Sequence, residues 1–332
     1  MPVVSSSQSV LITGANGFIG SRLCALFLRS GFRVVAGVRK TSDVSLLKGL
    51  EVEYRHGDVT LAESIPAMVS GVDVVVHNAG LVKAKSREQF FEVNAGGTAQ
   101  LLAGVLQHDP NCRKVVLISS MAASGPSLNG KPTKEEDLPH PVTVYCESKL
   151  AGEREALKFA SKLHVVILRP SGVYGPGDKE TITFFKSAAK GIRPYFGDTT
   201  RRLQLVHVDD LCRCVLAAVT RPTKSGDVFF VAEKRALSLA ELVDCLCRAA
   251  GKRGFPLVVP GPVFRLIAAL SEFGFKLVGA TPMLTREKAN ELLASWEIST
   301  EKARRQLGFE SQIPFEEGSR ETFGWYRQQG WI

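Results

Sequence analysis

Short apolar runs alternate with stretches of helical periodicity through the first half of the chain. Runs rich in β-branched and other apolar residues predict strands near residues 9–13, 32–40, 52–56, 72–77, 114–118 and 164–168. Between several of them, apolar residues recur every three or four positions, as at Leu23, Phe27 and Leu28, which predicts helices. Continuous apolar strands alternating with helices predict an α/β fold with a parallel, doubly wound sheet.

The alternation breaks at a run of turn-forming residues, 169–178, which indicates a change of domain. A strand and a helix return over 203–219. We therefore expect a first domain over residues 1–175, to which segment 203–230 returns. Residues 176–202 and 231–332 are expected to form a smaller, mostly helical domain that binds the substrate.

Residues 262–277 form the most informative pattern in the second half. Their apolar positions follow helical spacing, and the charged ones gather elsewhere on the helical wheel: Val263, Leu266, Ile267, Leu270, Phe273 and Leu277 against Arg265, Glu272 and Lys276. Three interpretations stay open. The helix packs in a core, forms a lid over a lipophilic substrate, or contacts a membrane surface.

A glycine-rich turn joins the first predicted strand to the first predicted helix. Gly14 would make the tight turn, Gly17 would let the backbone approach a pyrophosphate, and Gly20 would let the helix pack closely on the strand. A structural glycine turn is the alternative. With a strand before it and a helix after it, we predict dinucleotide binding by Gly14, Asn16, Gly17, Phe18, Ile19 and Gly20.

Further cofactor contacts are predicted where the following strands end. Arg39 and Lys40 stand where an NAD-preferring fold would carry an acidic residue, so they favour the 2′-phosphate of NADP, with NAD possible; solvated loop cations are the alternative. Asp58 would cap the next helix or contact the adenine amine, with Val59 beside it. The small residues of Asn78, Ala79 and Gly80 would let the ribose lie against backbone. Asn94 is either a buried capping amide or a polar group on the cofactor side.

The candidate catalytic chemistry lies in Tyr145 and Lys149, four residues apart in a helical pattern, so that both share one helix face. A neighbouring ammonium favours the phenolate and would prepare the phenol for proton transfer. A surface helix is the alternative interpretation. Ser120, at the end of the fifth predicted strand, is placed to hydrogen-bond a reacting oxygen, because ligands bind at the carboxyl ends of parallel strands.

Composition narrows the classes of function. The 332 residues carry a formal net charge of +9, but no basic run concentrates it, so nucleic-acid binding is not predicted. We expect no signal peptide at the N-terminus and no apolar run long enough to cross a membrane. Seven cysteines without C-x-x-C spacing predict reduced thiols in the cytoplasm and no metal site.

Taken together, TGANGFIG, GDVT, HNAG, the serines at 119 and 120, YCESK, LRPSGVYGPGD and VHVDD resemble the extended short-chain dehydrogenase/reductase family, part of the epimerase/dehydratase superfamily. The resemblance covers residue 9 to about residue 220. It implies that Tyr145 is the acid/base, that Lys149 lowers the Tyr145 pKa and binds the nicotinamide ribose, and that Ser120 polarises the substrate oxygen. It also implies that the nicotinamide is contacted by Pro170, Gly172 and Val173, and it suggests a homodimer formed through helices around 90–106 and 145–162.

Within the family, one pattern separates the substrate classes. Sugar-nucleotide enzymes usually carry an Arg-Asp pair just before the VHVDD-like strand, where the arginine helps to hold the substrate diphosphate. Leu203 and Gln204 stand there, and Arg201 and Arg202 lie upstream. The chain instead resembles the 3β-hydroxysteroid dehydrogenase and dihydroflavonol reductase branches. We therefore expect an oxidoreductase that interconverts a secondary alcohol and a ketone on a small, largely apolar substrate. A nucleotide-sugar epimerase or dehydratase with tightly bound NAD is the alternative.

Overall fold

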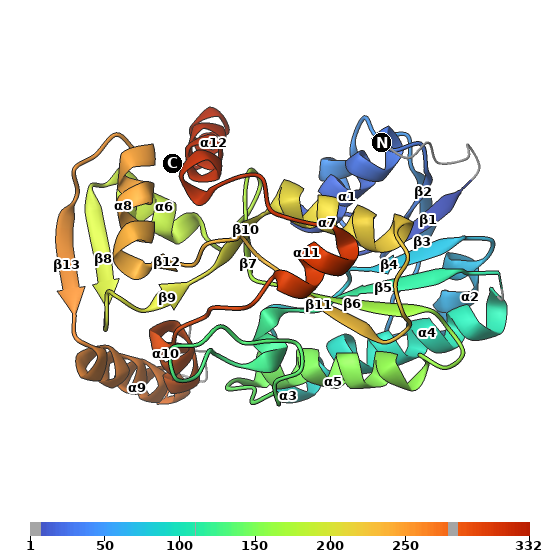
Figure 1. Cartoon of the computed structure of the whole chain (residues 1–332), viewed down its shortest axis with the longest axis horizontal. Coiled ribbons are helices and arrows are strands. Elements are labelled where there is room, and N and C mark those ends of the chain that lie inside the picture. The colour runs from blue at the N-terminus through green and yellow to red at the C-terminus, as the bar shows by residue number, and fades with distance from the viewer. Residues whose placement is uncertain (1–7, 110, 278–284) are drawn as a thin grey trace.

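The computed structural model describes residues 8–109, 111–277 and 285–332, with the side chains of 276 and 277 excepted (Figure 1). The N-terminal residues 1–7, on which part of the signal-peptide prediction depends, lie outside the described residues. The predicted positions of Lys276 and Leu277 on the helical wheel lie outside the described side chains.

A parallel sheet of seven strands forms the larger half of the described chain, at the right of Figure 1. Its strands, in spatial order, are β11 (Asp227–Val231), β6 (Val165–Pro170), β5 (Lys114–Ile118), β4 (Val74–His77), β1 (Ser9–Thr13), β2 (Arg33–Val38) and β3 (Glu53–His56). The order reverses between β1 and β4, so the chain winds outward in both directions from the middle of the sheet. This is the doubly wound dinucleotide-binding fold, and the predicted fold class is confirmed.

Helices cover both faces of this sheet. Successive side chains of a strand point to opposite faces of the sheet, so the buried side chains of these strands form two hydrophobic cores, one on each face. One core packs against α1 (Phe18–Arg29), α7 (Val208–Thr220) and α11 (Glu301–Leu307), and the other packs against α2 (Ile65–Val69), α4 (Gly97–His108) and α5 (Val144–Lys158). Short 3-10 turns η1 (Ser45–Leu47), η2 (Ala62–Ser64) and η4 (Met121–Ser124) lie in the loops.

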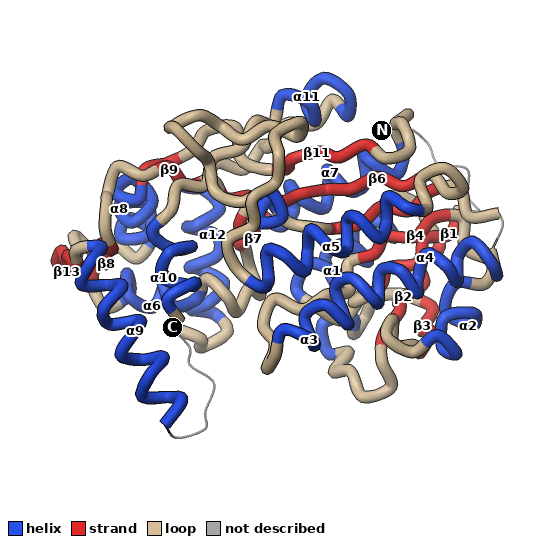
Figure 2. Tube along the Cα trace, turned by 90° about the horizontal axis from the view of Figure 1, so that it is seen from below, coloured by secondary structure: helices blue, strands red, loops and turns tan. Residues whose placement is uncertain are grey.

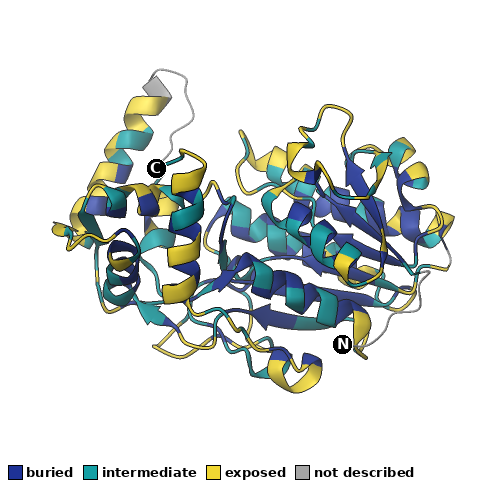
Figure 3. Cartoon of the chain, turned by 90° about the horizontal axis from the view of Figure 1, so that it is seen from above, coloured by how far each residue is buried: buried dark blue, intermediate teal, exposed yellow. Residues whose placement is uncertain are grey.

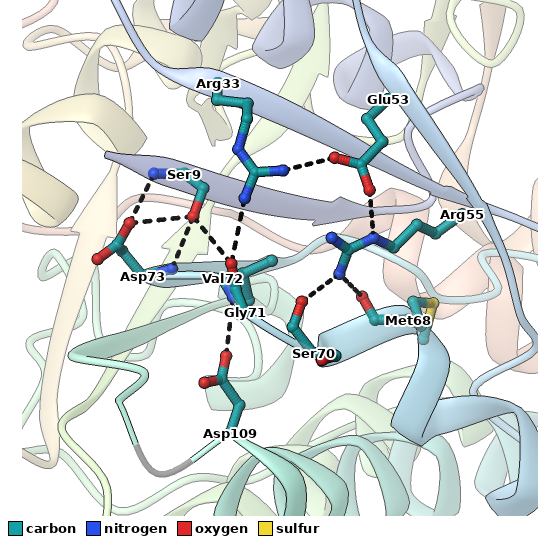
Figure 4. Close-up of polar contacts among 10 residues, drawn as sticks. All are labelled: Ser9, Arg33, Glu53, Arg55, Met68, Ser70, Gly71, Val72, Asp73 and Asp109. Carbon is teal, nitrogen blue, oxygen red and sulfur yellow. Dashed lines mark hydrogen bonds and ion pairs between the residues drawn. The ribbon is translucent and has the colours of Figure 1, made fainter. Parts of the chain in front are cut away.

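Polar side chains tie the strands together at the edge of the sheet where the chain enters them (Figure 4). Glu53 accepts from both Arg33 and Arg55 across β2 and β3, at 2.5 and 2.7 Å. Asp73 accepts from the backbone N–H of Ser9 at 2.8 Å. This edge lies opposite the glycine turn, so these contacts stabilise the sheet and leave the other edge to the candidate site.

The smaller half, at the left of Figure 1, is built from helices and short strand pairs. It contains α6 (Ile182–Ala189), α8 (Leu239–Ala249), α9 (Gly261–Leu277), α10 (Arg286–Leu293) and α12 (Phe315–Gln328), with the parallel pair β8 (Ile192–Phe196) and β13 (Phe255–Val259). Two further pairs connect the halves: β7 (Gly172–Tyr174) with β10 (Leu205–His207), and β9 (Arg202–Leu203) with β12 (Leu237–Ser238). The predicted mostly helical C-terminal region is therefore present.

Two local predictions need adjustment. The helix expected around residues 90–106 is interrupted: α3 (Arg87–Phe91) passes through a π-helix, η3 (Glu92–Gly96), before α4 begins. The turn-rich run after Leu168 contains the end of β6 and all of β7. All seven cysteines are free thiols, as predicted. Within the described residues, no helix is both long and apolar enough to cross a bilayer.

Candidate active site

The glycine turn leaves the start of α1 open to a ligand. Gly14 has a φ of +64°, which favours glycine, and a Cβ there would lie 3.0 Å from the Cα of Ala79. A Cβ on Gly20 would overlap the Gly14 carbonyl, so α1 can pack this closely only on glycine. Gly17 caps α1 with no side chain to fill the position, and the first turn has no acidic residue. The N–H groups at this helix end therefore fit a phosphate group.

The other residues predicted at the adenosine end lie around this turn. Phe18 and Ile19 begin α1, and the Asn16 side chain donates to the carbonyl oxygen of Asp43 at 3.1 Å. Arg39 and Lys40 follow β2 and are exposed, at the edge of the sheet where the glycine turn lies. Both the 2′-phosphate role and the solvated-cation alternative remain compatible with these positions.

Asp58 uses its carboxylate locally. One oxygen accepts from the backbone N–H of Thr60 at 3.0 Å and from its hydroxyl at 2.8 Å, so Asp58 caps the turn that follows β3. Val59 is buried against Gly97 of α4. Neither η2 nor α2 has a side-chain cap, so the helix-capping role predicted for Asp58 is not found, and its contact with the adenine stays a prediction. Asp58 is only partly buried.

The residues after β4 are held by the first strand. Thr13 accepts from the backbone N–H groups of Asn78 and Ala79, each at 3.1 Å, and the Asn78 amide donates to the Gly14 carbonyl at 3.3 Å. A Cβ on Gly80 would lie 3.0 Å from the Asn94 side-chain oxygen and 3.7 Å from Lys149 Nζ. This small-residue segment therefore brings the glycine turn, Asn94 and Lys149 into one region.

Tyr145, Lys149 and Ser120 are also brought together. Thr143 caps α5 and accepts from the backbone N–H of Cys146. Lys149 Nζ donates to the carbonyl oxygen of Ile118, the last residue of β5, at 2.9 Å. Ser120 follows β5; its hydroxyl accepts from the backbone N–H of Ala122 at 3.1 Å and lies close enough to the Tyr145 phenol to lower its pKa. The three residues predicted to be catalytic therefore meet at the carboxyl end of the sheet.

The titration properties differ from the sequence-based expectation. Burial raises the pKa of the Tyr145 phenol to about 12, although the nearby Ser120 hydroxyl opposes the rise. Burial lowers the pKa of Lys149 to about 8, opposed by the nearby Glu153 carboxylate. The predicted lowering of the Tyr145 pKa by Lys149 is therefore not found in this structure. Desolvation is the largest cause of the shift, Lys149 is not among its causes, and the ammonium donates to the Ile118 carbonyl.

Asn94 lies in the π-helix, and its amide is fully used within the protein. Its oxygen accepts from Leu81 N–H at 2.8 Å, and its nitrogen donates to the Leu81 carbonyl and to the Ser148 hydroxyl at 3.0 and 2.9 Å. Asn94 is buried, so of its two interpretations the buried capping amide is the one observed. It links the segment after Gly80 to the helix that carries Tyr145 and Lys149.

A buried ion pair between Arg169 and Glu153 lies next to the site, and sequence reasoning did not predict it. Arg169, at the end of β6, pairs with Glu153 at 2.6 Å, and both side chains are almost completely buried. Glu153 also accepts from the Ser119 hydroxyl at 2.5 Å, and Arg169 donates to Ser124 at 2.9 Å. The one signal was spacing: Glu153 lies one helical turn after Lys149.

The residues predicted to face the nicotinamide lie on two adjoining strands. Pro170 ends β6 and is paired with Val231, while Gly172 and Val173 belong to β7 and pair with Leu205 and Val206. Pro170 is next to Arg169, whose side chain reaches the loop after β5. These three residues therefore stand at the carboxyl end of the sheet, as Ser120 does.

Comparisons with known proteins agree with this arrangement. Residues 10–232 match the model of the NAD dependent epimerase/dehydratase family. The chain is 29% identical over 330 residues to a ceramide reductase of Caulobacter vibrioides, covering 97% of this chain and 96% of that protein. It is 30% identical over 327 residues to a UDP-glucose 4-epimerase of Vibrio cholerae, covering 95% and 94%.

Two more matches have the same extent. A 3 beta-hydroxysteroid dehydrogenase/Delta 5→4-isomerase of Mycobacterium tuberculosis is 27% identical over 337 residues, covering 96% of this chain and 90% of that protein. The solved structure of MoeE5 in complex with UDP-glucuronic acid and NAD is 25% identical, with a TM-score of 0.76 and coverage of 97% and 99%. The chain belongs to the NAD dependent epimerase/dehydratase family, and it is an enzyme of the extended short-chain dehydrogenase/reductase type.

Proposed function

We propose that the protein is an NAD(P)-dependent oxidoreductase that interconverts a secondary alcohol and a ketone on a small, largely apolar molecule. The observation that carries this proposal is that Arg201 and Arg202, the arginines before the VHVDD-like strand, already make contacts within the protein. Arg201 donates to the carbonyl oxygens of Phe196 and Asp198 and is buried. Arg202 donates to the Ala236 carbonyl and lies within 3.8 Å of the Glu297 carboxylate. Arg201 is therefore enclosed and held by backbone carbonyls, whereas Arg202 makes these contacts with its side chain 41% exposed.

The surroundings of Tyr145 support an apolar substrate. Its cluster contains Met121, Ala122, Cys146, Leu203, Ala294 and Trp296. Gln204, which stands in the position of the usual sugar-nucleotide residue, donates to the Glu233 carbonyl and accepts from Ile298 N–H, each at 2.7 Å. Gln204 is therefore structural, and this cluster places apolar side chains beside Tyr145, with Ser120 and Glu291 as polar neighbours of the phenol.

The roles of the candidate residues follow from their positions. The nicotinamide dinucleotide supplies the hydride acceptor or donor. Ser120 holds the reacting oxygen, and Tyr145 exchanges its proton. The phenol holds its proton at neutral pH, because burial raises its pKa, so it can donate that proton to an oxygen that gains charge, as in ketone reduction. Lys149 is placed to bind the ribose beside Gly80.

A nucleotide-sugar epimerase or dehydratase is the second candidate. The match to a UDP-glucose 4-epimerase and the UDP-glucuronic acid bound in MoeE5 favour it. In that reaction the cofactor stays bound and is regenerated in each cycle, so the protein would purify with NAD and would bind a uridine diphosphate. The contacts of Arg201 and Arg202 argue against this candidate.

A substrate screen separates the two candidates. NADPH and NADH oxidation is measured with steroid, flavonoid, long-chain and aliphatic ketones, and binding is measured in parallel with UDP- and dTDP-sugars. We expect turnover with at least one apolar ketone and no binding of nucleotide sugars. Binding of a nucleotide sugar together with co-purified NAD would overturn the oxidoreductase proposal in favour of the second candidate.

Preference for NADP is tested at Arg39. If its guanidinium binds the 2′-phosphate, Arg39→Ala should weaken NADP binding by about tenfold or more, since a hydrogen bond to a charged group contributes ~1.5–3 kcal/mol, and leave NAD binding nearly unchanged. Both affinities are measured by titration calorimetry, with the exposed Arg33→Ala, at the far edge of the sheet, as control. Equal losses for NADP and NAD would remove the 2′-phosphate role.

Two remaining expectations are also proposals. A homodimer formed through α4 and α5 would follow the pattern suggested by the resemblance, and sedimentation tests it.

A cytoplasmic location is supported by the seven free thiols, most of them buried.

A further inference from the structure

Helix α9 uses one side to pack and exposes an apolar side. Phe264 and Ala268 are buried against Ala289 of α10, and the Phe264 ring stacks on Phe196 with ring centroids 4.8 Å apart. The charged residues serve the same attachment: Arg265 donates to the Asn290 amide oxygen at 2.9 Å, and Glu272 lies 3.6 Å from Arg286. The polar groups that would normally face water are therefore directed toward α10.

The outward side of α9 consists of large apolar side chains. Five of them, each between 46% and 64% exposed, follow the i, i+3, i+4, i+7 spacing of one helix face: Val263, Leu266, Ile267, Leu270 and Phe273. In Figure 3, α9 is the helix at the upper left that leads into the grey trace, and much of its surface is exposed. Figure 2 shows it projecting from the body of the molecule. Contiguous exposed apolar surface of this kind marks a contact site.

Strand β13 extends this surface. It leads directly into α9 at the same end of the molecule (Figure 1), and its Phe255, Leu257 and Val258 are 49% to 75% exposed. The loop before β13 carries the exposed cations Lys252 and Arg253. From residue 245 to residue 271 the sequence has four cations and no carboxylate. Lys252 and Arg253 therefore precede β13 and the apolar face of α9 follows it, both in the smaller half at the left of Figure 1.

We propose that α9 and β13 dock the protein on an anionic membrane surface, with the apolar face of α9 inserted among the lipids and Lys252 and Arg253 at the headgroups. Interfacial helices bind through buried apolar area together with attraction between basic residues and anionic lipid. A second copy of this chain is the competing occupant, and the test below distinguishes it from a membrane.

The position of α10 gives this surface a link to the candidate active site. Glu291 of α10 is close enough to Tyr145 to raise the pKa of the phenol, and Ala294, just after α10, packs in the Tyr145 cluster. The α9–α10 pair thus lies between the outer apolar face and the phenol. A lipophilic substrate dissolved in the bilayer would be delivered to this side of the protein, an argument that rests on the proposed function.

Vesicle flotation with the purified full-length protein tests the proposal without any substrate. The vesicles are phosphatidylcholine alone or phosphatidylcholine mixed with phosphatidylglycerol. We expect binding to the mixed vesicles. Leu270→Glu should weaken it by at least about tenfold, because it removes an inserting side chain and adds a repelled charge. Leu46→Glu makes the same change at a residue 50% exposed on the dinucleotide-binding half, and should bind as the unchanged protein does.

Charge and self-association provide the remaining outcomes. Lys252→Glu/Arg253→Glu should lose most of the preference for phosphatidylglycerol, and added salt should weaken binding in the unchanged protein. Failure of the unchanged protein to float with mixed vesicles would overturn the proposal. So would a dimer, detected by sedimentation, that Leu270→Glu dissociates while vesicle binding is absent. Because flotation needs no turnover, a failure here is distinct from failure of the oxidoreductase proposal.

Discussion

Replacing Tyr145 with phenylalanine is expected to lower turnover by about a hundredfold or more while leaving dinucleotide affinity nearly unchanged. The substitution removes one hydroxyl, which lies near Ser120 at the carboxyl end of the sheet. The ring, its contact with Phe90 and the helix that carries Lys149 are retained. The loss should therefore fall on the proton-transfer step and appear in kcat.

The measurement is steady-state turnover of an apolar ketone found in the screen, together with a separate titration of the cofactor. Tyr54→Phe is the matched control, because Tyr54 is exposed on β3, away from the phenol of interest. If the Tyr145 variant turns over at the rate of the unchanged protein, Tyr145 is not the acid/base. If cofactor affinity falls with turnover, the hydroxyl contributes to binding.

The strands of the parallel sheet could be predicted from sequence, because a strand that is buried on both faces appears as a short continuous run of apolar residues. The strands near 9–13 and 114–118 have the predicted bounds, since continuous apolar runs are typical of parallel strands covered by helices. The helix α8 has a cap that is equally local, since the Ser238 side chain and Glu241 form a capping box. The glycine turn was identifiable because its spacing has a steric cause at Gly14 and Gly20.

Features that depend on contacts between distant segments had no such signal. The β8–β13 pair joins segments about sixty residues apart, and neither strand could be recognised alone. The raised pKa of Tyr145 results from burial in the folded chain, with a smaller contribution from the charge of Glu291 on α10, whereas the spacing of Tyr145 and Lys149 indicated only a nearby cation. The meeting of Glu153 and Arg169 beneath the site likewise required the sheet to bring α5 and β6 together.

That buried pair leads to the largest expected effect on stability. Arg169→Met should lower the free energy of unfolding by about 3–5 kcal/mol, because it leaves the Glu153 carboxylate charged and buried without its cation. Ser124 also loses its donor, while the Ser119 hydrogen bond alone cannot neutralise the charge. Urea unfolding measures the loss. Arg33→Met is the control: it breaks the half-exposed pair with Glu53 and should cost about 1 kcal/mol or less.

A second substitution identifies the cause of the loss. In Arg169→Met/Glu153→Gln the uncompensated charge is gone, while an amide oxygen can still accept from Ser119. The double variant should therefore be more stable than Arg169→Met alone, with a coupling energy of about 1–3 kcal/mol. A double variant that is less stable than either single variant would show that Arg169 acts by packing and by its bond to Ser124. Recovery of stability would show that Arg169 stabilises the protein mainly by compensating the buried charge of Glu153, close to Tyr145 and Lys149.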